Sequence, residues 1–428
     1  MSARNAGRAG RGPEGPAGEA DGRPEPVLLV LNAGSSSVKF AAYTAPAGRV
    51  TGSGQGRRPG PSEPAERLRG QLDGIGGPAR LAVRGEPPRP VEAGDHAAAL
   101  DAIVSLLAGR LGGSPVAAVG HRIVHGGTAH AAPVTIDDRV LGELEALVPL
   151  APLHQPHNIA GVLAARRAFP GARQLACFDT AFHRGHPFVN DAFALPRKLY
   201  DEGVRRYGFH GLSYEFVAGE VARRHPELAA GRLVIAHLGN GASMCAVRDG
   251  RSLASTMGFS ALDGLPMGTR CGQLDPGVLL YLMGERGMSL EALTEMLYRE
   301  SGLKGLSGLS HDMRELEAAD TPAAREAIDY FVFRIRREIG AMAAALGGLD
   351  GLVFCGGIGE NAAGLRARVC AGLEFLGLAV DAAANARGAG EIGAGRARIL
   401  VVPTDEERVI ARALVARQAA EARAPGAS

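Results

Sequence analysis

Hydrophobic residues along the chain form short continuous runs that alternate with longer segments of helical spacing. Val27–Leu31 is fully apolar and predicts a buried strand, and Val38–Tyr43 predicts a second strand after a Gly/Ser-rich turn. The same pattern of strand, Gly/Ser turn and strand returns at Leu233–Val247. Two such units about two hundred residues apart predict a duplicated two-domain architecture, although two unrelated hairpins would give the same pattern.

The remaining pattern predicts further strands and helices in alternation. Short apolar runs predict strands at Val116–Val119, Gln174–Phe178, Asp350–Cys355 and Ala397–Val402. Helical spacing predicts helices at Ala97–Leu111, Val140–Val148, Asn158–Phe169, Tyr214–Arg224, Ser289–Ser301, Thr321–Leu346, Gly364–Gly372 and after Pro403–Arg408. Ala45–Asp95, rich in Gly, Pro and Arg, is expected to hold loops and weak edge strands. This alternation indicates an α/β fold with central sheets.

The composition excludes several classes of protein. Met1–Pro26 contains no Val, Ile, Leu or aromatic residue, which predicts a disordered extension without the apolar centre of a signal peptide. No apolar run reaches the roughly eighteen residues of a membrane span. The 47 basic and 45 acidic residues leave a net charge of +2, which argues against a nucleic-acid partner.

The cysteines favour a reduced, cytoplasmic protein. Their number is odd, their spacing is wide and no CxxC pair occurs. Each stands beside apolar or Gly residues, which predicts buried thiols rather than reactive ones. The five are Cys177, Cys245, Cys271, Cys355 and Cys370.

Three Gly-rich turns stand where predicted buried strands stop, which is the usual place of a ligand site in an α/β sheet. They are Asn32–Lys39, Gly239–Ser243 and Gly356–Asn361. Small residues and free amides in such turns favour an anion, although the first turn alone would also suit a tight hairpin. No GxxxxGK[ST] sequence occurs, so we expect a nucleotide held between two domains rather than on a P-loop.

Several charged residues follow the same logic. Arg122 and Arg270 each stand in a Gly-flanked turn, where a guanidinium can form a fork on carboxylate or phosphate; a surface ion pair is the alternative for either. Asp179 ends an apolar strand, where its carboxylate could be catalytic or bind a metal; a helix N-cap is the alternative. Glu406 and Glu407 follow the last strand and offer a Mg²⁺ ligand or simple first-turn acids.

Histidines occur in close pairs, a spacing that invites a zinc interpretation. There is no HExxH sequence, however, and the pairs fall in Gly/Pro-rich turns. We therefore favour histidine as a hydrogen-bond donor to a phosphoryl group and keep a metal-dependent hydrolase as an alternative. The residues are His121 with His125, His154 with His157, His183 with His186, and His210.

The ordered motifs of the chain resemble those of the acetate kinases. They are NAGSSSVK, GHRIVHGG, APLHQPHNI, FDTAFH, RRYGFHGLSY, HLGNGAS, STMGFSALDGLPMGTRCG, CGGIGEN and PTDEE. The resemblance implies the duplicated actin/sugar-kinase/Hsp70-like (ribonuclease H-like) fold, with an acyl/phosphate domain of residues 27–179 plus 405–428 and a nucleotide-binding domain of residues 180–404. It implies a homodimer that uses ATP/ADP and Mg²⁺ (Mn²⁺ could substitute) to convert acetate, or another short-chain carboxylate, to acetyl phosphate.

The resemblance also implies a role for each residue at a matching position. The catalytic group comprises Arg122, His154, Asp179, His210 and Arg270, and the metal environment comprises Asn32 and Glu406. The pocket for the acyl group comprises Val124, Leu153, Phe209 and Ala261, with Arg122 on the carboxylate. The nucleotide loops comprise Ser35, Ser37, Lys39, His237, Leu238, Gly239, Asn240, Gly241, Asp312, Met313, Arg314, Gly356, Gly357, Ile358, Gly359, Glu360 and Asn361.

The charges of the reactants support these roles independently. A carboxylate must approach an anionic phosphate, and each unit-charge pair at about 4 Å costs about 4 kcal/mol at an effective dielectric near 20. Two arginines, two histidines and Mg²⁺ can offset that repulsion without a covalent protein intermediate. Retention of all these side chains disfavours a third alternative, a catalytically silent nucleotide-binding protein.

Some residues depart from the usual motifs of the family. Ala261 stands where a proline usually walls the acyl pocket, so a propionate kinase remains a close alternative to an acetate kinase. Tyr214 replaces a histidine in the motif that carries His210. The other departures are Gln155, His157, Leu212, Gln273, Met313 and Asp405.

Overall fold

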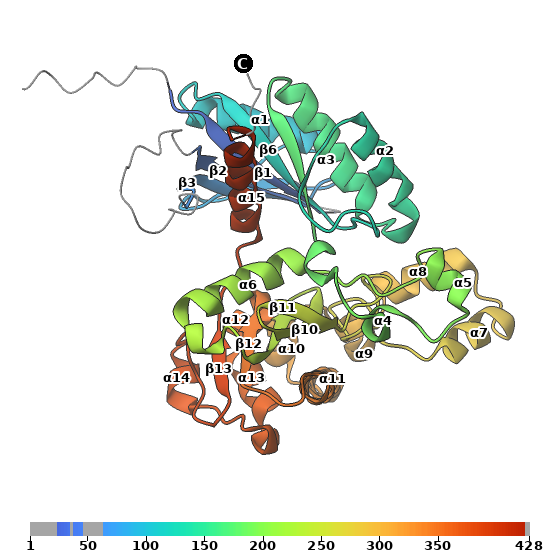
Figure 1. Cartoon of the computed structure of the whole chain (residues 1–428). Helices are drawn as coiled ribbons and strands as arrows, with labels where there is room; N and C mark the ends of the chain where they lie inside the picture. Colours follow the sequence, from blue (N-terminus) through green and yellow to red (C-terminus); the bar gives the residue numbers. More distant parts are fainter. Residues whose placement is uncertain (1–23, 35–36, 46–62, 424–428) are drawn as a thin grey trace, which may run out of the picture.

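The computed structural model describes residues 24–34, 37–45 and 63–423, which form two mixed β-sheets covered by helices (Figure 1). The first sheet has eight strands in the order β5-β4-β3-β2-β1-β6-β8-β7. Their bounds are β1 Val27–Ala33, β2 Ser37–Thr44, β3 Glu66–Asp73, β4 Arg80–Val83, β5 Arg89–Pro90, β6 Val116–Ile123, β7 Val134–Thr135 and β8 Arg173–Phe178.

The second sheet repeats the central part of the first. Its five strands follow the order β11-β10-β9-β12-β13, with bounds β9 Arg232–Leu238, β10 Ala242–Arg248, β11 Arg251–Ser255, β12 Gly351–Cys355 and β13 Arg398–Val401. In β3-β2-β1-β6-β8, as in this sheet, the first three strands are antiparallel and the last two run parallel to the central one. Equal order and equal direction confirm the predicted duplication.

Helices cover both faces of each sheet. On the first sheet, α1 (His96–Arg110) and α3 (Gln155–Ala168) pack on the outer face. On the second, α11 (Pro322–Leu346) packs on the outer face. The other helices are α2 Asp138–Ala146, α4 Phe188–Asp191, α5 Arg197–Asp201, α7 Pro276–Gly284, α8 Leu290–Arg299, α9 Gly302–Ser307, α10 Met313–Ala319, α12 Gly356–Asn361, α13 Ala363–Cys370 and α14 Ala382–Ala386.

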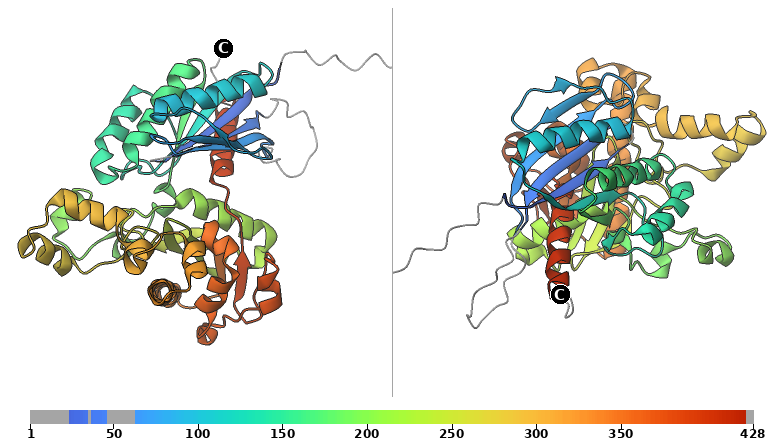
Figure 2. Two further views of the ribbon diagram at one scale, coloured as in Figure 1. Left: turned by 180° about the vertical axis from the view of Figure 1, so that it is seen from behind. Right: turned by 90° about the horizontal axis from the view of Figure 1, so that it is seen from above.

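Two helices lie between the sheets and join them into one apolar core (Figures 1 and 2). Helix α6 (Gly211–Arg224) packs on the second sheet, and α15 (Glu406–Glu421) packs on β1 and β6 of the first. A Cβ at Gly120 on β6 would collide with Ile410, so α15 can lie this close only on a glycine. The chain therefore returns from β13 of the second sheet to complete the first.

The structure corrects several expectations about local structure. Arg122 lies at the end of β6 rather than in a turn, because the strand continues through Ile123 in register with β8. Strand β3 has eight residues and is paired on both sides, although weak edge strands were expected there. The apolar run of α7 gave no periodic signal, and this helix was not predicted. Ser35 and residues 1–23 of the expected extension lie outside the described residues.

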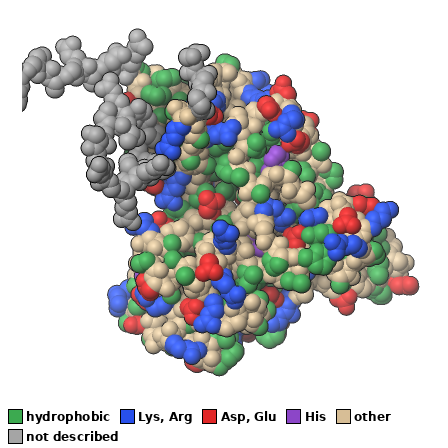
Figure 3. Space-filling view, viewed as in Figure 1, with side chains coloured by type: hydrophobic (Ala, Val, Ile, Leu, Met, Phe, Trp, Pro, Cys, Tyr) green, Lys and Arg blue, Asp and Glu red, His purple; other side chains and the backbone are tan. Residues whose placement is uncertain are grey.

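The cysteines, the helices and the surface charges of the described residues agree with what the composition predicts. All five cysteines are described and unpaired, four of them are buried, and Cys271 is half-buried. No described helix combines the length and the apolar character needed to cross a membrane. On the face shown in Figure 3, basic and acidic side chains are interspersed, in keeping with the small net charge.

Candidate functional site

A polar cavity of about 500 Å³ lies between the two sheets and brings together thirteen of the predicted site residues. It is bounded by the ends of β1, β6 and β9, the turn after β9, the start of α12 and the segment that leads into α15. The lining residues are Asn32, Gly34, Ser37, Lys39, Arg122, His210, His237, Gly239, Asn240, Gly241, Gly356, Gly357, Glu360, Thr404, Glu406 and Glu407. Gly34, Thr404 and Glu407 were not predicted to line a nucleotide site.

Arg122 is held in place by a carboxylate behind the cavity. Its Nε and Nη2 donate to the two carboxylate oxygens of Asp179 at 2.9 and 2.5 Å, and Nη1 donates to Asn32 Oδ1 at 3.1 Å. Burial disfavours a charge here, but Asp179 and Glu406 outweigh it and raise the pKa of Arg122 above its usual value. Asp179 is buried and does not line the cavity, so it orients the guanidinium from behind.

Arg270 lies beside Gly241, which lines the large cavity, but is not itself among the lining residues and has no such partner. It lies in an irregular loop, as predicted, and its Nη1 donates to the carbonyl oxygen of Ala261 at 3.0 Å. Within the described part of the chain no carboxylate pairs with it, and burial lowers its pKa. A Cβ built on Gly241 would lie 3.6 Å from Arg270 Nη2 and 3.3 Å from His210 Nε2, so both donors converge on this turn. A buried cation without a counterion is suited to an anionic ligand.

Burial lowers the pKa of both predicted catalytic histidines. His154 stands at the N-cap of α3, and burial, together with Arg270 and Arg122, lowers its pKa to about 3. His210 stands at the N-cap of α6 in a left-handed conformation, with φ 57°. Burial and the neighbouring His237 hold its pKa well below the usual value. The structure therefore favours neutral imidazoles, a point that the sequence left open.

A second cavity of about 530 Å³ continues from the first and shares Gly239, Asn240 and Gly357 with it. Its size and mixed lining suit a nucleoside. The predicted Asp312, Met313, Arg314, Ile358 and Asn361 line it, together with His311, Glu317 and Ala362, which were not predicted.

Two residues predicted for the nucleotide loops do not line either cavity. The side chain of Leu238 is buried in the core of the second sheet, and Gly359 is buried within α12. Glu360 has a structural contact as well, because its carboxylate accepts from the backbone amides of Gly356 and Thr404. The predicted turn Gly356–Asn361 forms the helix α12, and this carboxylate ties the start of that helix to the segment that carries Glu406.

A small apolar pocket adjoins Arg270 and holds about 10 Å³ of free space. All four residues predicted for the acyl group line it: Val124, Leu153, Phe209 and Ala261. His154 and Tyr298 close it, with Leu150, Ala151 and Pro152. Free space of this size accommodates one water-sized group.

The site offers oxygen donors for a metal ion but no complete set of ligands. Asn32 Nδ2 lies 3.4 Å from Glu406 Oε2, and both residues line the large cavity. No group of three or more His, Cys, Asp or Glu suited to a metal occurs among the described residues. Such a donor set fits Mg²⁺, which takes one or two protein oxygens and completes its shell with phosphates and water.

Comparison with known proteins gives concordant matches over the described fold. A sequence model of the acetokinase family matches residues 27–412. The acetate kinase of Methylocella silvestris is 57% identical over 394 residues, which cover 90% of this chain and 96% of that protein. The acetate kinase of Nitrobacter hamburgensis is 50% identical over 395 residues, covering 90% and 94%.

Solved structures match over the same range. A crystal structure of Porphyromonas gingivalis acetate kinase has a TM-score of 0.78 at 37% identity and covers 90% of this chain and 98% of that chain. A propionate kinase from Francisella tularensis has a TM-score of 0.81 at 34% identity, with 91% and 98% covered.

Proposed function

The chain belongs to the acetokinase family, and from this premise we propose that it transfers the γ-phosphoryl group of ATP reversibly to acetate, forming acetyl phosphate and ADP. As a member it is a phosphotransferase that acts on a carboxyl group, with the duplicated actin/sugar-kinase/Hsp70-like fold. The observation that carries the proposal is the pair of guanidinium groups, Arg122 and Arg270. They come from different elements and both lower the pKa of His154; Arg122 lines the large cavity, and Arg270 lies beside Gly241, which also lines it.

The proposed chemistry is a direct in-line transfer in which the protein cancels charge. Asp179 occupies the Nε/Nη2 edge of Arg122 and so orients the remaining N–H groups of its guanidinium. Arg270 has no carboxylate partner among the described residues that would compete with an anion. His210 and His154 each contribute one N–H to oxygens that gain charge in the transition state. Because all of these groups act by hydrogen bonding and charge, the reaction needs no covalent protein intermediate.

We place the nucleotide along the two connected cavities, with its phosphates beside Gly239–Gly241, Ser37 and Lys39. The nucleoside then lies beside Asp312–Arg314 in the second cavity. Asn32 and Glu406 would hold Mg²⁺ or Mn²⁺, and a bound divalent ion supplies positive charge to the phosphates. We also propose that residues 27–179, together with α15, form one domain that moves relative to a second domain of residues 180–404. We propose that the enzyme is cytoplasmic.

The proposal is tested by trapping the acyl phosphate as its hydroxamate. Purified protein with ATP, Mg²⁺ and acetate is expected to form acetyl hydroxamate, with an equal amount of ADP. Protein that forms none, under conditions where the Methylocella silvestris relative does, contradicts the proposal. Zinc-dependent, nucleotide-independent activity after treatment with a chelator would instead support the hydrolase alternative.

The small apolar pocket favours acetate over propionate. Although Ala261 lacks a proline ring, Tyr298 also lines the pocket, and the remaining space suits one methyl group. We expect kcat/KM for acetate to exceed that for propionate about tenfold, since one methylene is worth about 1–3 kcal/mol. The hydroxamate assay with both acids measures this ratio, and a tenfold preference for propionate would favour the propionate kinase alternative.

Resizing the pocket checks the same prediction from both sides. Val124→Ala removes two methyl groups from the pocket wall and is expected to shift the kcat/KM ratio toward propionate by about tenfold. Val124→Ile adds a methylene and is the matched control, expected to sharpen the preference for acetate. Equal ratios in the two variants would show that this pocket does not receive the acyl chain.

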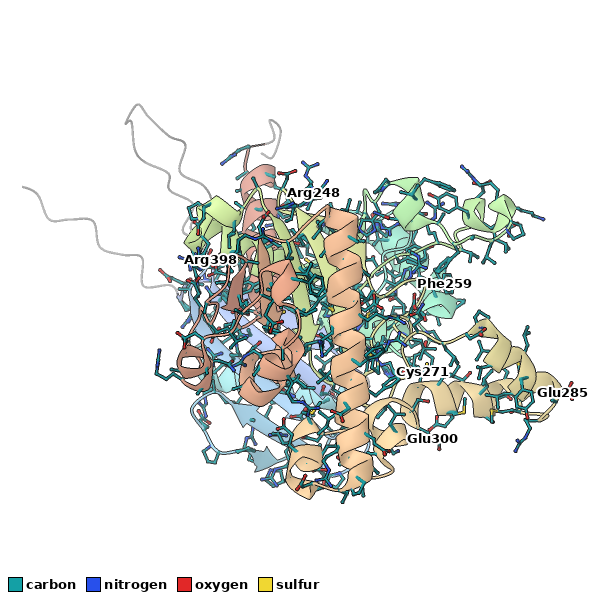
Figure 4. All side chains as sticks on the ribbon, turned by 90° about the horizontal axis from the view of Figure 1, so that it is seen from below. Arg248, Phe259, Cys271, Glu285, Glu300 and Arg398 are labelled. Carbon is teal, nitrogen blue, oxygen red and sulfur yellow. The ribbon has the colours of Figure 1, made fainter. Side chains whose placement is uncertain are left out.

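We further propose a homodimer, supported by an apolar helix that no other described residue covers. No residue of α7 is buried, although most are apolar, and Leu280 is 73% exposed. Helices α7 and α8 project from the second sheet (Figure 2, right), and Glu285 marks the tip of this arm in Figure 4. An exposed apolar face of this kind marks a protein contact, and a second copy of the chain supplies it.

Substitution in the arm tests the dimer. Leu280→Asp places a charge in the proposed contact and is expected to convert the protein to monomer, measured by light scattering after size exclusion. Phe375→Asp is the matched control, because Phe375 is 74% exposed but lies between α13 and α14, away from the arm in sequence and structure. A wild-type protein that is monomeric at micromolar concentration contradicts the proposal.

A further inference from the structure

A buried phenol stands behind the predicted catalytic histidine. Tyr214 on α6 is fully buried, and Ser243 Oγ on β10 is the only hydrogen-bond partner of its hydroxyl among the described residues. The same Ser243 Oγ lies 2.8 Å from Nδ1 of His210. Ser243 is itself fully buried. The side chains of Tyr214, Ser243 and His210 are thus joined by two successive hydrogen bonds, and His210 lies at the cavity.

The number of hydrogens on these three side chains fixes the direction of each hydrogen bond between them. A phenol and a serine hydroxyl each carry one hydrogen, and a neutral imidazole carries one N–H. A buried phenolic hydrogen left unpaired is strongly unfavourable, so Tyr214 donates to Ser243. The hydrogen of Ser243 must then go to its other partner, His210 Nδ1. Burial raises the pKa of Tyr214 well above its usual value, so the phenol keeps its hydrogen.

The other ring nitrogen of His210 faces the reaction site. Nε2 lies beside the Gly241 turn, where Arg270 Nη2 also converges, and His210 lines the large cavity. The ring of His237 stacks on that of His210, with centroids 4.3 Å apart, and fixes its plane. With Nδ1 occupied as an acceptor, the single hydrogen of a neutral ring must reside on Nε2.

We infer that Tyr214 is a positioning residue that acts through Ser243 to lock His210 in the tautomer with hydrogen on Nε2, so that the ring donates to the transferring phosphoryl group. The inference rests on the proposed function for the acceptor, but the tautomer itself is a property of the resting protein. Without the donor Tyr214, Ser243 can accept from Nδ1–H, and Nε2 then turns a lone pair toward the phosphate.

Nitrogen NMR reads the tautomer directly. In wild-type protein labelled with ¹⁵N-histidine, His210 is expected to show an unprotonated Nδ1 and a protonated Nε2, assigned by comparison with His210→Gln. Tyr214→Phe is expected to shift both signals toward a mixture of tautomers. Tyr207→Phe is the matched control: Tyr207 is also buried, but its hydroxyl donates to the carbonyl of Gly203, so the signals of His210 should not move.

Kinetics provide a second readout. Tyr214→Phe is expected to lower kcat about tenfold, because it removes the one hydrogen bond that favours the tautomer with hydrogen on Nε2. The KM values for ATP and acetate should stay within about twofold of wild type, because binding does not depend on the tautomer. Ser243→Ala removes the relay, and adding Tyr214→Phe to it should cause no further loss. Additive losses would indicate independent structural effects and overturn the relay.

The outcomes separate this inference from the proposed function. A protonated Nδ1 in resting wild-type protein overturns the inference, even if the hydroxamate assay succeeds and whether or not any variant folds. An unchanged tautomer and an unchanged kcat in folded Tyr214→Phe overturn it as well. A wild-type protein with the expected tautomer and no acyl phosphate would overturn the proposed function alone.

Discussion

Arg270→Ala is expected to lower kcat at least about a hundredfold and to leave the folded protein as stable as wild type. In the structure this guanidinium has no carboxylate partner among the described residues and makes one side-chain hydrogen bond, to the carbonyl of Ala261. Its removal therefore breaks no ion pair and relieves a buried charge. The hydroxamate assay measures kcat, and thermal unfolding measures stability. Calorimetry measures ATP binding, which should remain measurable.

Two further variants control this experiment. Arg270→Lys keeps the charge but loses the planar fork, and we expect an intermediate kcat. Arg398→Ala removes a partly exposed arginine from β13, labelled in Figure 4, which pairs with Glu391 and Glu227 and is not among the residues that line the two large cavities. Its kcat should equal that of wild type. Turnover like that of wild type in Arg270→Ala would refute the assigned role.

Arg122→Ala is expected to lose at least about a hundredfold in kcat and, unlike Arg270→Ala, to lose stability as well. It leaves Asp179 buried without the two hydrogen bonds that it accepts from the guanidinium. Breaking a buried pair in this way costs about 3–5 kcal/mol. Denaturant unfolding measures the loss of stability, and the hydroxamate assay measures the loss of activity.

A second substitution separates the two effects. In the double variant Arg122→Ala/Asp179→Asn, the buried negative charge is gone, so much of the lost stability should return while kcat remains low. If activity returned together with stability, Arg122 would act through folding alone. If the single variant were as stable as wild type, the pair would not contribute to the stability of the fold.

The duplicated sheets could be predicted because their cause is local. Val27–Leu31 and Leu233–Ala236 are apolar on both faces, so each pattern predicts a buried central strand without knowledge of its surroundings. The end of β6 could not be predicted in this way. His121 and Arg122 are polar, and only their partners, Gln174 and Asp179 near β8, allow the strand to continue through them.

The candidate site divides along the same line. Motifs placed the Gly-rich turns, the arginines and the histidines, because short motifs carry such chemistry. Tyr298 lines the acyl pocket from the end of α8, and nothing in its local sequence indicates this. The relay from Tyr214 through Ser243 joins residues far apart in sequence, and the hydrogen count that gives it meaning needs the three-dimensional contacts.

The position of α15 bears on how the protein is made. Its core face covers Leu28, Val30 and Ala118 of the first sheet, yet its codons are read after those of every other described element. While the ribosome is still translating, that face of the early sheet lacks its cover and is open to unwanted association. A chain that lacks α15 should therefore depend on chaperones, because without this last helix the first sheet cannot bury its apolar surface.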